Sequence, residues 1–241
     1  MKHSIAKSII LHLYPGVLTL SIYLLLTPWI NSIGYPSMMS LLISAVIGLI
    51  IPESLLLLHR SYRRNGRLVF KGIFIISERI NPARLAILVL TGFAIIAIAG
   101  TAIYFLEQPI KISLFSWLPE WYFFDGNFNR FSQKALLVTA IARVVVDGLL
   151  LPVVEELYFR GYLLPRMPET SFSQPLLASV LFTIYHFWQP WNYVSLFAAS
   201  LVLVFSVWKF KNLYLSIAIH VLANLVGSLL FLGFIGSIRT N

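Results

Sequence analysis

Long, uninterrupted apolar segments restrict the fold of this chain more than any other feature of its sequence. About seven of them follow one another along the 241 residues, and most are about twenty residues long. They cover roughly residues 9–30, 38–58, 85–106, 134–164, 174–188, 193–208 and 213–235. A helix of about twenty apolar residues spans the hydrocarbon core of a bilayer. Because a backbone in lipid must satisfy its own hydrogen bonds, we expect an all-α polytopic transmembrane bundle of about seven spans.

Composition supports this interpretation of the apolar segments. Hydrophobic residues make up 59% of the chain and charged residues 11%, whereas soluble domains carry about 25% charged residues. A transmembrane β-barrel would instead show segments of roughly ten residues with alternating polarity. The first run is long and no small-residue cleavage site follows it, so we expect a retained span rather than a signal peptide. The absence of cysteine excludes disulfides, thiolate metal sites and a cysteine nucleophile.

The net charge of +9 is distributed unevenly between the spans. Most lysines and arginines lie in the N-terminal lead, in the loops 59–84 and 160–173, and in the turn 209–212. These segments fall on one side of the membrane in a seven-span topology. The positive-inside rule therefore predicts a multi-pass integral membrane protein with its N-terminus in the cytoplasm and its C-terminus outside. We attribute the positive charge to orientation in the lipid bilayer and expect no nucleic-acid partner.

The chain divides into two parts by the position of its polar motifs. We find neither an internal repeat nor a soluble domain. Residues 1–133 contain N-terminal spans without a recognisable motif, together with the basic loop 59–84. Residues 134–235 contain all the polar patterns described below, and we expect this part to be a catalytic helical core.

The most informative polar pattern is the pair Glu155-Glu156 followed by Arg160. Glu156 and Arg160 are four residues apart and share one helix face, whereas Glu155 points about 100° away. The two carboxylates therefore have different roles, one paired with the arginine and one facing elsewhere. The alternative is that both acids are simply solvated at a cytoplasmic helix end. Pro152 cannot donate to the carbonyl of Gly148, so we also expect a kink beside the acids.

Three further pairs in the later spans have the same spacing of four residues. Phe182 precedes His186, His220 precedes Asn224, and Arg143 precedes Asp147. A lone histidine of this kind is more often a structural residue than a catalytic one, and for His220 the structural interpretation makes Asn224 its local partner. We interpret Arg143 and Asp147 as a structural ion pair near the outer end of their span.

Polar residues in a membrane bundle face its interior. Several polar side chains of the later spans are therefore expected to converge on one cavity. These are Glu155 or Glu156, His186, His220 and Asn224.

This set of side chains is suited to the activation of a water molecule. Burial makes a carboxylate a better base near neutral pH, and an amide with a histidine can stabilise a developing oxyanion. Both features suit hydrolysis of an amide bond. Alternatively, Glu155, His186 and His220 form a plausible zinc triad with one open position. The sequence lacks the His-Glu-x-x-His pattern of zinc proteases, so no cofactor is assigned and a divalent metal such as zinc stays an open alternative.

The three motifs together resemble a known family. Glu-Glu-Leu-Tyr-Phe-Arg-Gly at 155–161, Phe182-x-x-x-His186 and His220-x-x-x-Asn224 are similar, in this order, to those of the CAAX protease and bacteriocin-processing (CPBP, or Abi) family of intramembrane endopeptidases. The resemblance covers roughly residues 134–235, and none of the three motifs departs from the pattern. The family is described both as metal-dependent and as glutamate-type, so the resemblance leaves the metal open.

The resemblance also implies a role for each residue of the motifs. Glu155 would be the catalytic glutamate that activates water, with Glu156 and Arg160 orienting it. His186 would be the second catalytic group, and His220 with Asn224 would bind the water or the oxyanion.

The sequence therefore favours an intramembrane endopeptidase that cleaves a membrane-associated peptide or protein at or near the cytoplasmic face. A proton-coupled transporter, with the same acids and histidines as a relay, is one alternative. Transporters often contain inverted repeats and matched broken helices, and we find no repeat here. A non-catalytic immunity or scaffold protein of the same family is the other alternative.

Overall fold

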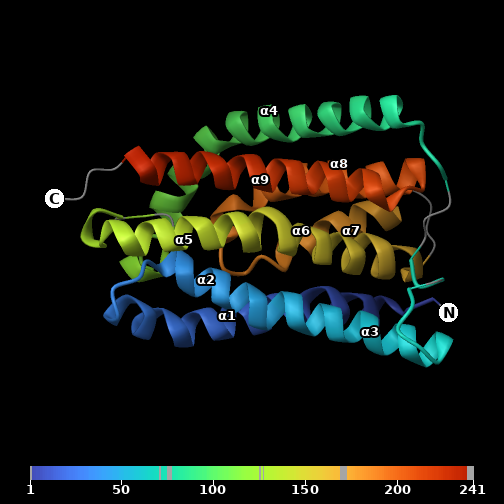
Figure 1. The fold of residues 1–241 in the computed structure, drawn as a ribbon, viewed down its shortest axis with the longest axis horizontal. Helices are drawn as coiled ribbons and strands as arrows, with labels where there is room; N and C mark the ends of the chain where they lie inside the picture. Colours follow the sequence, from blue (N-terminus) through green and yellow to red (C-terminus); the bar gives the residue numbers. More distant parts are fainter. Residues whose placement is uncertain are drawn as a thin grey trace.

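The computed structural model describes residues 2–70, 72–74, 78–124, 126, 128–168 and 173–237, and no strand occurs among them. The chain forms a bundle of roughly parallel and antiparallel helices (Figure 1). The α-helices are α1 (Ile5–Ser32), α2 (Ser37–Ala45), α3 (Ile51–Asn65), α4 (Pro82–Leu114), α5 (Gln133–Val145), α6 (Leu151–Glu155), α7 (Ser173–Ile184), α8 (Tyr193–Phe210) and α9 (Leu213–Ser237). Short 3₁₀ turns are η2 (Glu120–Tyr122), η3 (Phe128–Arg130), η6 (Leu164–Arg166) and η7 (Pro190–Asn192).

Six helices in the described ranges are long and apolar enough to cross a membrane, and α7 is a shorter apolar helix of 12 residues. This confirms the predicted helical membrane bundle of about seven spans. At 1.5 Å per residue α7 is about 18 Å long, roughly half of the length needed to cross a bilayer. The helix ends at Ile184, four residues before the predicted end of this span at Trp188. His186 therefore lies in the turn that follows α7, inside the bundle.

Two of the spanning helices contain π-helical turns directly before a proline. The π-helix η1 (Val46–Ile50) joins α2 to α3, and η4 (Val146–Leu150) joins α5 to α6. In η4 the amide of Leu151 donates to the carbonyl of Val146, five residues earlier. A proline at position 152 has no amide proton and its ring crowds the preceding turn, so a widened turn is a reasonable way to continue the helix. The distortion expected at Pro152 therefore takes the form of a π turn.

The same seven-residue pattern accompanies both π turns. Residues 46–52 and 146–152 both read Val-x-Gly-Leu-x-x-Pro, which is a short internal similarity between two spans. The helices that contain them run in the same direction through the bundle (Figure 1). The similarity is therefore not the inverted repeat that is common in transporters.

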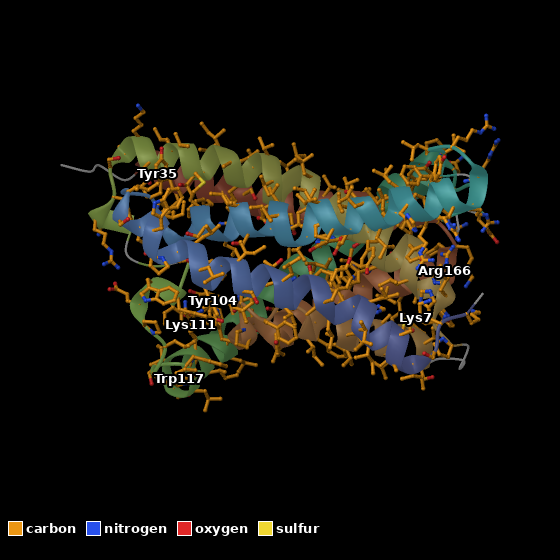
Figure 2. All side chains as sticks on the ribbon, turned by 90° about the horizontal axis from the view of Figure 1, so that it is seen from below. Lys7, Tyr35, Tyr104, Lys111, Trp117 and Arg166 are labelled. Carbon is orange, nitrogen blue, oxygen red and sulfur yellow. The ribbon has the colours of Figure 1, made fainter. Side chains whose placement is uncertain are left out.

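The two ends of the bundle differ in charge and in aromatic content. We call the end that holds the N-terminus and the loops around residues 60–80, 165–168 and 209–212 the basic end. The opposite end holds the turn at 33–36, the segment 115–131 and the turn at 188–192. Figure 2 shows Lys7 and Arg166 at the basic end, and Tyr35, Lys111 and Trp117 at the opposite end.

The N-terminal lead is fastened to the basic end. The amide of His3 donates to the carbonyl of Arg166 over 2.6 Å, and Lys2 Nζ donates to the carbonyl of Pro165 over 3.1 Å. Burial, and then the nearby charges of Lys7 and Arg166, lower the pKa of His3 to about 4. His3 is therefore neutral near pH 7, which is compatible with its position among these cations.

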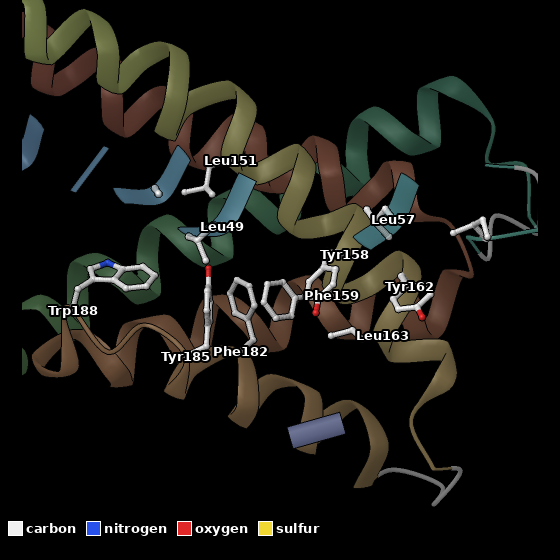
Figure 3. Close-up of a cluster of buried hydrophobic side chains, with 12 residues drawn as sticks. Leu49, Leu57, Leu151, Tyr158, Phe159, Tyr162, Leu163, Phe182, Tyr185 and Trp188 are labelled. Atoms are coloured by element: carbon white, nitrogen blue, oxygen red, sulfur yellow. The ribbon is translucent and has the colours of Figure 1, made fainter. Parts of the chain in front are cut away.

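The hydrophobic core consists of several clusters of buried side chains along the bundle. Its largest cluster joins Leu57 of α3 to the segment that ends at Leu163 and to residues in and after α7, and its aromatic members are Tyr158, Phe159, Tyr162, Phe182, Tyr185 and Trp188 (Figure 3). The hydroxyl of Tyr158 donates to the carbonyl of Leu11 over 2.7 Å, which ties α1 to this cluster. Gly16 lets α1 approach closely, because a Cβ atom there would overlap the carbonyl oxygen of Tyr185.

The helix α4 is the most peripheral element of the bundle, and it packs mainly on α8 and α9. Gly92 lies against the side chain of Ile219. Near its other end, buried Glu107 accepts hydrogen bonds from the amide and hydroxyl of Ser195, at 2.8 and 2.9 Å. A carboxylate at the start of a helix satisfies free amide groups there. Glu107 therefore fixes the beginning of α8, which forms one wall of the site.

Candidate active site

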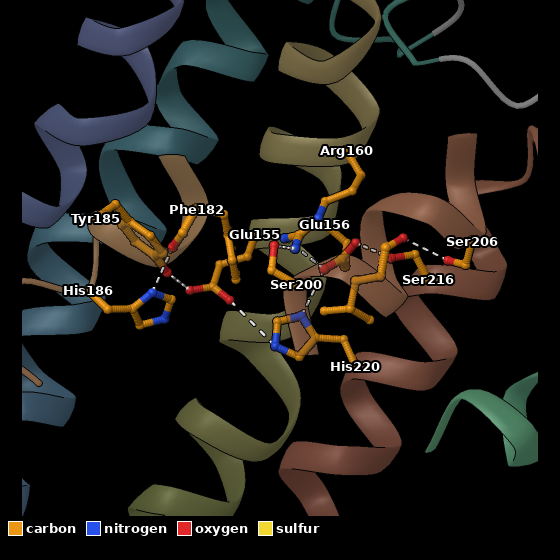
Figure 4. A network of polar contacts seen from close by, with 11 residues as sticks. Glu155, Glu156, Arg160, Phe182, Tyr185, His186, Ser200, Ser206, Ser216 and His220 are labelled. Atoms are coloured by element: carbon orange, nitrogen blue, oxygen red, sulfur yellow. Dashed lines mark hydrogen bonds and ion pairs between the residues drawn. The ribbon is translucent and has the colours of Figure 1, made fainter. Parts of the chain in front are cut away.

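The polar residues predicted from the sequence meet in the middle of the bundle. Glu155 ends α6, Glu156 and Arg160 lie in the π-helix η5 (Glu156–Leu163), His186 follows α7, and His220 lies in α9. A π-helix of eight residues is unusual, and such distortions are frequent at functional sites. Figure 4 shows the side chains of Glu155, Glu156 and His220 pointing toward one another. All five side chains are buried, with at most 9% of each residue exposed.

Glu156 is the most heavily bonded member of this group. Its Oε1 lies 3.1 Å from Arg160 Nη1 and 2.8 Å from His220 Nδ1, and its Oε2 accepts a hydrogen bond from the hydroxyl of Ser216. This confirms the predicted pairing of Glu156 with Arg160. A carboxyl group that is paired with an arginine and faces two further donors acts as an ionised acceptor. Glu156 is thus a fixed negative charge that positions its neighbours.

Arg160 is held from three sides within the same core. Its Nη2 donates to the hydroxyl of Ser200 over 3.3 Å, and its guanidinium lies 3.8 Å from the ring centroid of Phe182. The contact with the aromatic face adds a cation–π attraction in a desolvated site. The positive charge therefore has both a carboxylate and an aromatic ring to compensate its burial.

Glu155 has fewer partners than Glu156 and a different environment. Its Oε1 accepts a hydrogen bond from the hydroxyl of Tyr185, and its Oε2 lies 3.7 Å from His220 Nε2. That distance is longer than a hydrogen bond, although a water molecule can bridge such a gap. Of the two acids, Glu155 lines a cavity and Glu156 does not. The helical angle between the two residues separates them as the sequence predicted.

The surroundings of the two histidines favour one tautomer for each. His220 Nδ1 faces the carboxylate of Glu156, and His186 Nδ1 lies 2.9 Å from the carbonyl oxygen of Phe182. Both partners are acceptors, so we assign the proton to Nδ1 in each ring. Nε2 is then the ring nitrogen that each histidine leaves open for another partner.

A cavity of about 310 Å³ adjoins these side chains. Four of the residues predicted to converge line it, namely Glu155, His186, His220 and Asn224. The other lining residues are mostly apolar and come from α2, α4, α5, α6, α7, α8 and α9 and from the connecting segments that hold Phe124 and Trp188. They include Met38, Leu42, Ile96, Phe124, Leu151, Trp188, Leu196, Ala199, Leu203, Ala223 and Gly227. A concave apolar site with a few convergent polar groups is the usual form of a substrate pocket.

Asn224 lies at the wall of this cavity but is not the partner of His220. Its Nδ2 donates to the carbonyl of Asp147 over 3.1 Å, which leaves one amide proton for another acceptor. The predicted ion pair between Arg143 and Asp147 is confirmed, with Nε and Oδ2 3.3 Å apart. Asp147 also accepts from the hydroxyl of Ser228 over 3.1 Å. These residues connect η4 to α9 beside the cavity.

The side chains proposed as zinc ligands do not form a metal site in this arrangement. In the described part of the chain, no group of three or more His, Cys, Asp or Glu side chains is placed to hold one ion. A catalytic zinc site needs three protein ligands at about 2.0–2.2 Å from one point. The described side chains do not meet this requirement as they are placed, although Nε2 of His220 and Oε2 of Glu155 are both left open by their hydrogen bonds.

Three residues of the network, Tyr185, Ser200 and Ser216, and the buried Glu53 beside it were not singled out from the sequence. Ser216 lies four residues before His220 on the same face of α9, so helical periodicity around His220 would have indicated it. Tyr185 precedes His186 directly, and periodicity gives no signal for it. Glu53 lies outside the three motifs, directly after Pro52 and beside the π turn of the second span. Its only sequence signal is the seven-residue pattern that precedes both prolines.

Glu53 is a buried carboxyl group that has no hydrogen-bond partner within the described ranges. The residue is 0% exposed, and neither oxygen has a hydrogen-bond partner among the described residues. Glu155 and Arg160 are the charged groups that act on it most strongly, and it does not line the cavity. An unsatisfied buried polar group costs about 1–3 kcal/mol of stability. Glu53 is therefore a local weakness in the packing of α3.

We expect Glu53→Leu to raise the free energy of unfolding by about 1–3 kcal/mol, because the orphaned carboxyl is replaced by an apolar group of similar size. Thermal unfolding in detergent, followed by tryptophan fluorescence, measures the change. Glu53→Gln is the matched control, because an amide in the same position stays unsatisfied and brings no comparable gain. A lower unfolding temperature for Glu53→Leu would show that the carboxyl has a stabilising partner after all.

Comparison with known protein families agrees with the geometry of the site. Residues 137–226 match the family model described as Type II CAAX prenyl endopeptidase Rce1-like. Neither the curated proteins nor the solved structures that were searched include a significant match. The matched residues contain the three polar motifs and all the side chains of the network except Glu53. The match covers less than half of the chain, and over this segment the chain is similar to the CPBP family of CAAX-type intramembrane proteases, as the three motifs predicted.

Proposed function

We propose that this protein is an intramembrane endopeptidase in which the carboxylate of Glu155 activates a water molecule. One observation supports the proposal above all others. Glu155 is the member of the acid pair that faces the cavity, 3.7 Å from an imidazole nitrogen whose ring is held by the other member. A water molecule beside Oε2 of Glu155 and Nε2 of His220 would be oriented by both groups.

The hydrolysis needs two proton transfers, and Glu155 is able to perform both. In the first step the carboxylate takes a proton from the water while the water oxygen bonds to the peptide carbonyl carbon. The carbonyl oxygen then has the negative charge, and the free amide proton of Asn224 is available to stabilise it. In the second step Glu155 returns the proton to the leaving nitrogen, and the carbon–nitrogen bond breaks. The products are a new carboxyl end and a new amine.

The other residues of the site position these groups. Glu156 holds His220 through Nδ1, and Arg160 neutralises the charge of Glu156. Tyr185 directs one oxygen of Glu155 and leaves the second oxygen for the water. His186 presents Nε2 at the cavity wall, where it is available to bind the substrate or the leaving group. Because these hydrogen bonds are already formed before the substrate binds, less reorganisation is needed during the reaction.

The role of Asn224 gives a first test within the site. We expect Asn224→Ala to lower kcat by about 10²–10³-fold, or about 2.7–4 kcal/mol, as found when one oxyanion donor is removed. Ser228→Ala is the control, because it removes a hydrogen bond to the same Asp147 but does not reach the cavity. Rates are measured with the purified protein in lipid vesicles. A loss smaller than about 1 kcal/mol for Asn224→Ala would make its role structural only.

The substrate is best identified in cells. Membrane peptides from cells with the wild-type protein are compared with those from cells with Glu155→Gln. We expect at least one membrane-associated peptide to persist uncut in the variant and to appear as two fragments in the wild type. An unchanged peptide population, with normal expression of both proteins, would contradict the proposed proteolysis.

A proton-coupled transporter stays the second candidate because of one observation. A further cavity of about 170 Å³, lined by Lys2, Gln174, Trp208 and Lys211, reaches Arg160 from the basic end. The charged network thus lies between two cavities on different sides, as a proton relay would. Proton flux into vesicles distinguishes the two functions, because the protease gives none above that of protein-free vesicles.

A further inference from the structure

A hollow of about 520 Å³ lies at the basic end of the bundle, apart from the candidate active site. Its walls come from the segment that leads into α4 and from the last turn of α8. Figure 1 shows the beginning of α4 at the same end of the bundle as the N-terminus. None of the residues of this hollow lines the cavity beside Glu155. The hollow is therefore a separate feature between two spanning helices, and the three sequence motifs do not include it.

Cationic side chains dominate the lining of this hollow. Arg79, Arg84 and Lys209 line it, against one acid, Glu78. All three cations are exposed, and none forms an ion pair with a carboxylate in the part of the chain that the structure describes. The guanidinium carbon of Arg84 and Nζ of Lys209 each lie 5.8 Å from the ring centroid of Phe210. Two positive charges from different helices thus gather around one ring, and an anion between them relieves their repulsion.

These cations lie at the boundary between the hydrocarbon and the headgroups of the bilayer. Arg84 directly precedes the apolar run of α4 at 85–106, and Lys209 directly follows the apolar run of α8 at 193–208. Because the apolar runs span the hydrocarbon, the side chains just outside them are at the level of the lipid phosphates. Ile80 and Phe210 are partly buried members of the same lining. The hollow thus combines positive charge with apolar surface at the depth where a phospholipid changes from headgroup to acyl chain.

We propose that this hollow binds the headgroup of an anionic phospholipid, whose phosphate joins Arg84 at the start of α4 to Lys209 at the end of α8. An arginine can donate two parallel hydrogen bonds to one phosphate, and a lysine adds a point charge. Basic pockets between spanning helices are known sites for anionic headgroups. A zwitterionic lipid is a poorer match, because its ammonium group meets three cations and only one carboxylate. The inference does not depend on the proposed proteolysis.

The protein itself holds the hollow in shape. Asn212 Nδ2 donates to the carbonyl of Glu78 over 2.8 Å, which ties the segment before α4 to the turn after α8. Asn81 caps α4, because its side-chain oxygen accepts from the amide of Ala83 over 2.9 Å. The binding groups are therefore brought together before the lipid arrives, which lowers the ordering cost of binding.

A lipid in this position acts on the walls of the candidate active site. The cavity there is lined by Leu203 of α8 and Ile96 of α4, among others. Hydrogen bonds from Ser195 to Glu107 already join these two helices at the opposite end of the bundle. A phosphate at the basic end joins them at their other ends. We therefore expect the lipid to stabilise α4 and α8 as a pair.

Native mass spectrometry of the purified protein in a neutral detergent tests the site directly. Phosphatidylglycerol is the anionic probe, and phosphatidylcholine is the zwitterionic one. We expect one phosphatidylglycerol to bind about tenfold more tightly than phosphatidylcholine, or better. Inorganic phosphate at the same concentration is expected to leave phosphatidylglycerol bound, because it has no acyl chain to contact the apolar part of the lining. Equal affinity for the two lipids, or displacement by inorganic phosphate, would overturn the proposal.

A pair of double variants distinguishes this hollow from the general positive charge of the basic end. We expect Arg84→Gln with Lys209→Gln to weaken the binding of phosphatidylglycerol about tenfold or more. Arg63→Gln with Arg67→Gln is the matched control, because it removes the same charge from exposed residues of the same end that do not line the hollow. The control is expected to keep the wild-type affinity to within about threefold. Equal weakening by both double variants would contradict a specific site.

A charge-retaining exchange separates loss of binding from loss of folding. Arg84→Lys with Lys209→Arg keeps both cations, and we expect it to bind phosphatidylglycerol to within about threefold of the wild type. Added phosphatidylglycerol is expected to raise the unfolding temperature of the wild type and of this variant, but not that of Arg84→Gln with Lys209→Gln. If the charge-retaining variant does not bind, or if the lipid stabilises the glutamine variant equally, then the proposed phosphate bridge is wrong.

Discussion

Glu155→Gln removes hydrolysis almost completely: we expect the purified variant in lipid vesicles to cleave about 10²–10⁴-fold more slowly than the wild type. A positioned general base contributes a factor of this size, and glutamine has the shape of glutamate without its basicity. The amide still accepts the hydrogen bond from Tyr185, so the variant folds and keeps its cavity. The initial rate of product formation at saturating substrate is the measurement.

Glu53→Gln provides a matched control for this experiment. It makes the same chemical change in the same buried core, at a residue that does not line the cavity. We expect it to keep the wild-type rate to within about threefold, well below the effect of losing a general base. Wild-type cleavage by Glu155→Gln, with the protein pure and folded, would remove Glu155 from the chemistry and the glutamate mechanism with it.

Arg160→Met is the substitution with the largest expected effect on stability. The change leaves the carboxylate of Glu156, which is 0% exposed, without its cation. Removing one partner of a buried ion pair costs about 3–5 kcal/mol, because the remaining charge stays desolvated. The contact with the face of Phe182 is lost as well. We expect a lower unfolding temperature in detergent and a smaller fraction of the protein in the membrane.

The double variant Arg160→Met with Glu156→Gln tests this explanation. Glutamine removes the uncompensated charge but still accepts a hydrogen bond from His220 or Ser216. We expect it to recover more than half of the lost stability, whereas activity stays low because His220 is less firmly oriented. If the double variant is as unstable as Arg160→Met alone, then packing of the arginine rather than its charge is what matters.

Much of the architecture could be predicted from the sequence because a membrane restricts secondary structure so strongly. Long apolar runs predicted the spanning helices, and the structure has six long ones with α7 as a shorter seventh. The exception is the end of the α7 span. Apolar composition continues to Trp188, but the helix ends at Ile184 and the chain turns at Tyr185 and His186. In the protein interior, a turn can be as apolar as a helix, so composition does not mark the boundary.

The candidate site was predictable wherever one helix contains both partners. The four-residue spacing of Glu156 and Arg160, or of Arg143 and Asp147, determines that they share a face, and both pairs are formed. Partners on different helices were not predictable in this way. His220 pairs with Glu156 rather than with Asn224, and Glu155 with Tyr185, because these contacts depend on the rotation and depth of neighbouring helices.

The sequence by itself therefore determined that the chain spans a membrane, which side is rich in positive charge, and that Glu155 and Glu156 face different ways. These properties follow from composition and from the period of a single helix. The tertiary structure decided which acid faces the cavity, which helices line the cavity, and that Glu53 is buried without a hydrogen-bond partner in the described part of the chain. Packing sets these features, because the helices of a bundle can be rotated and shifted relative to one another without any change in the periodicity of their sequences.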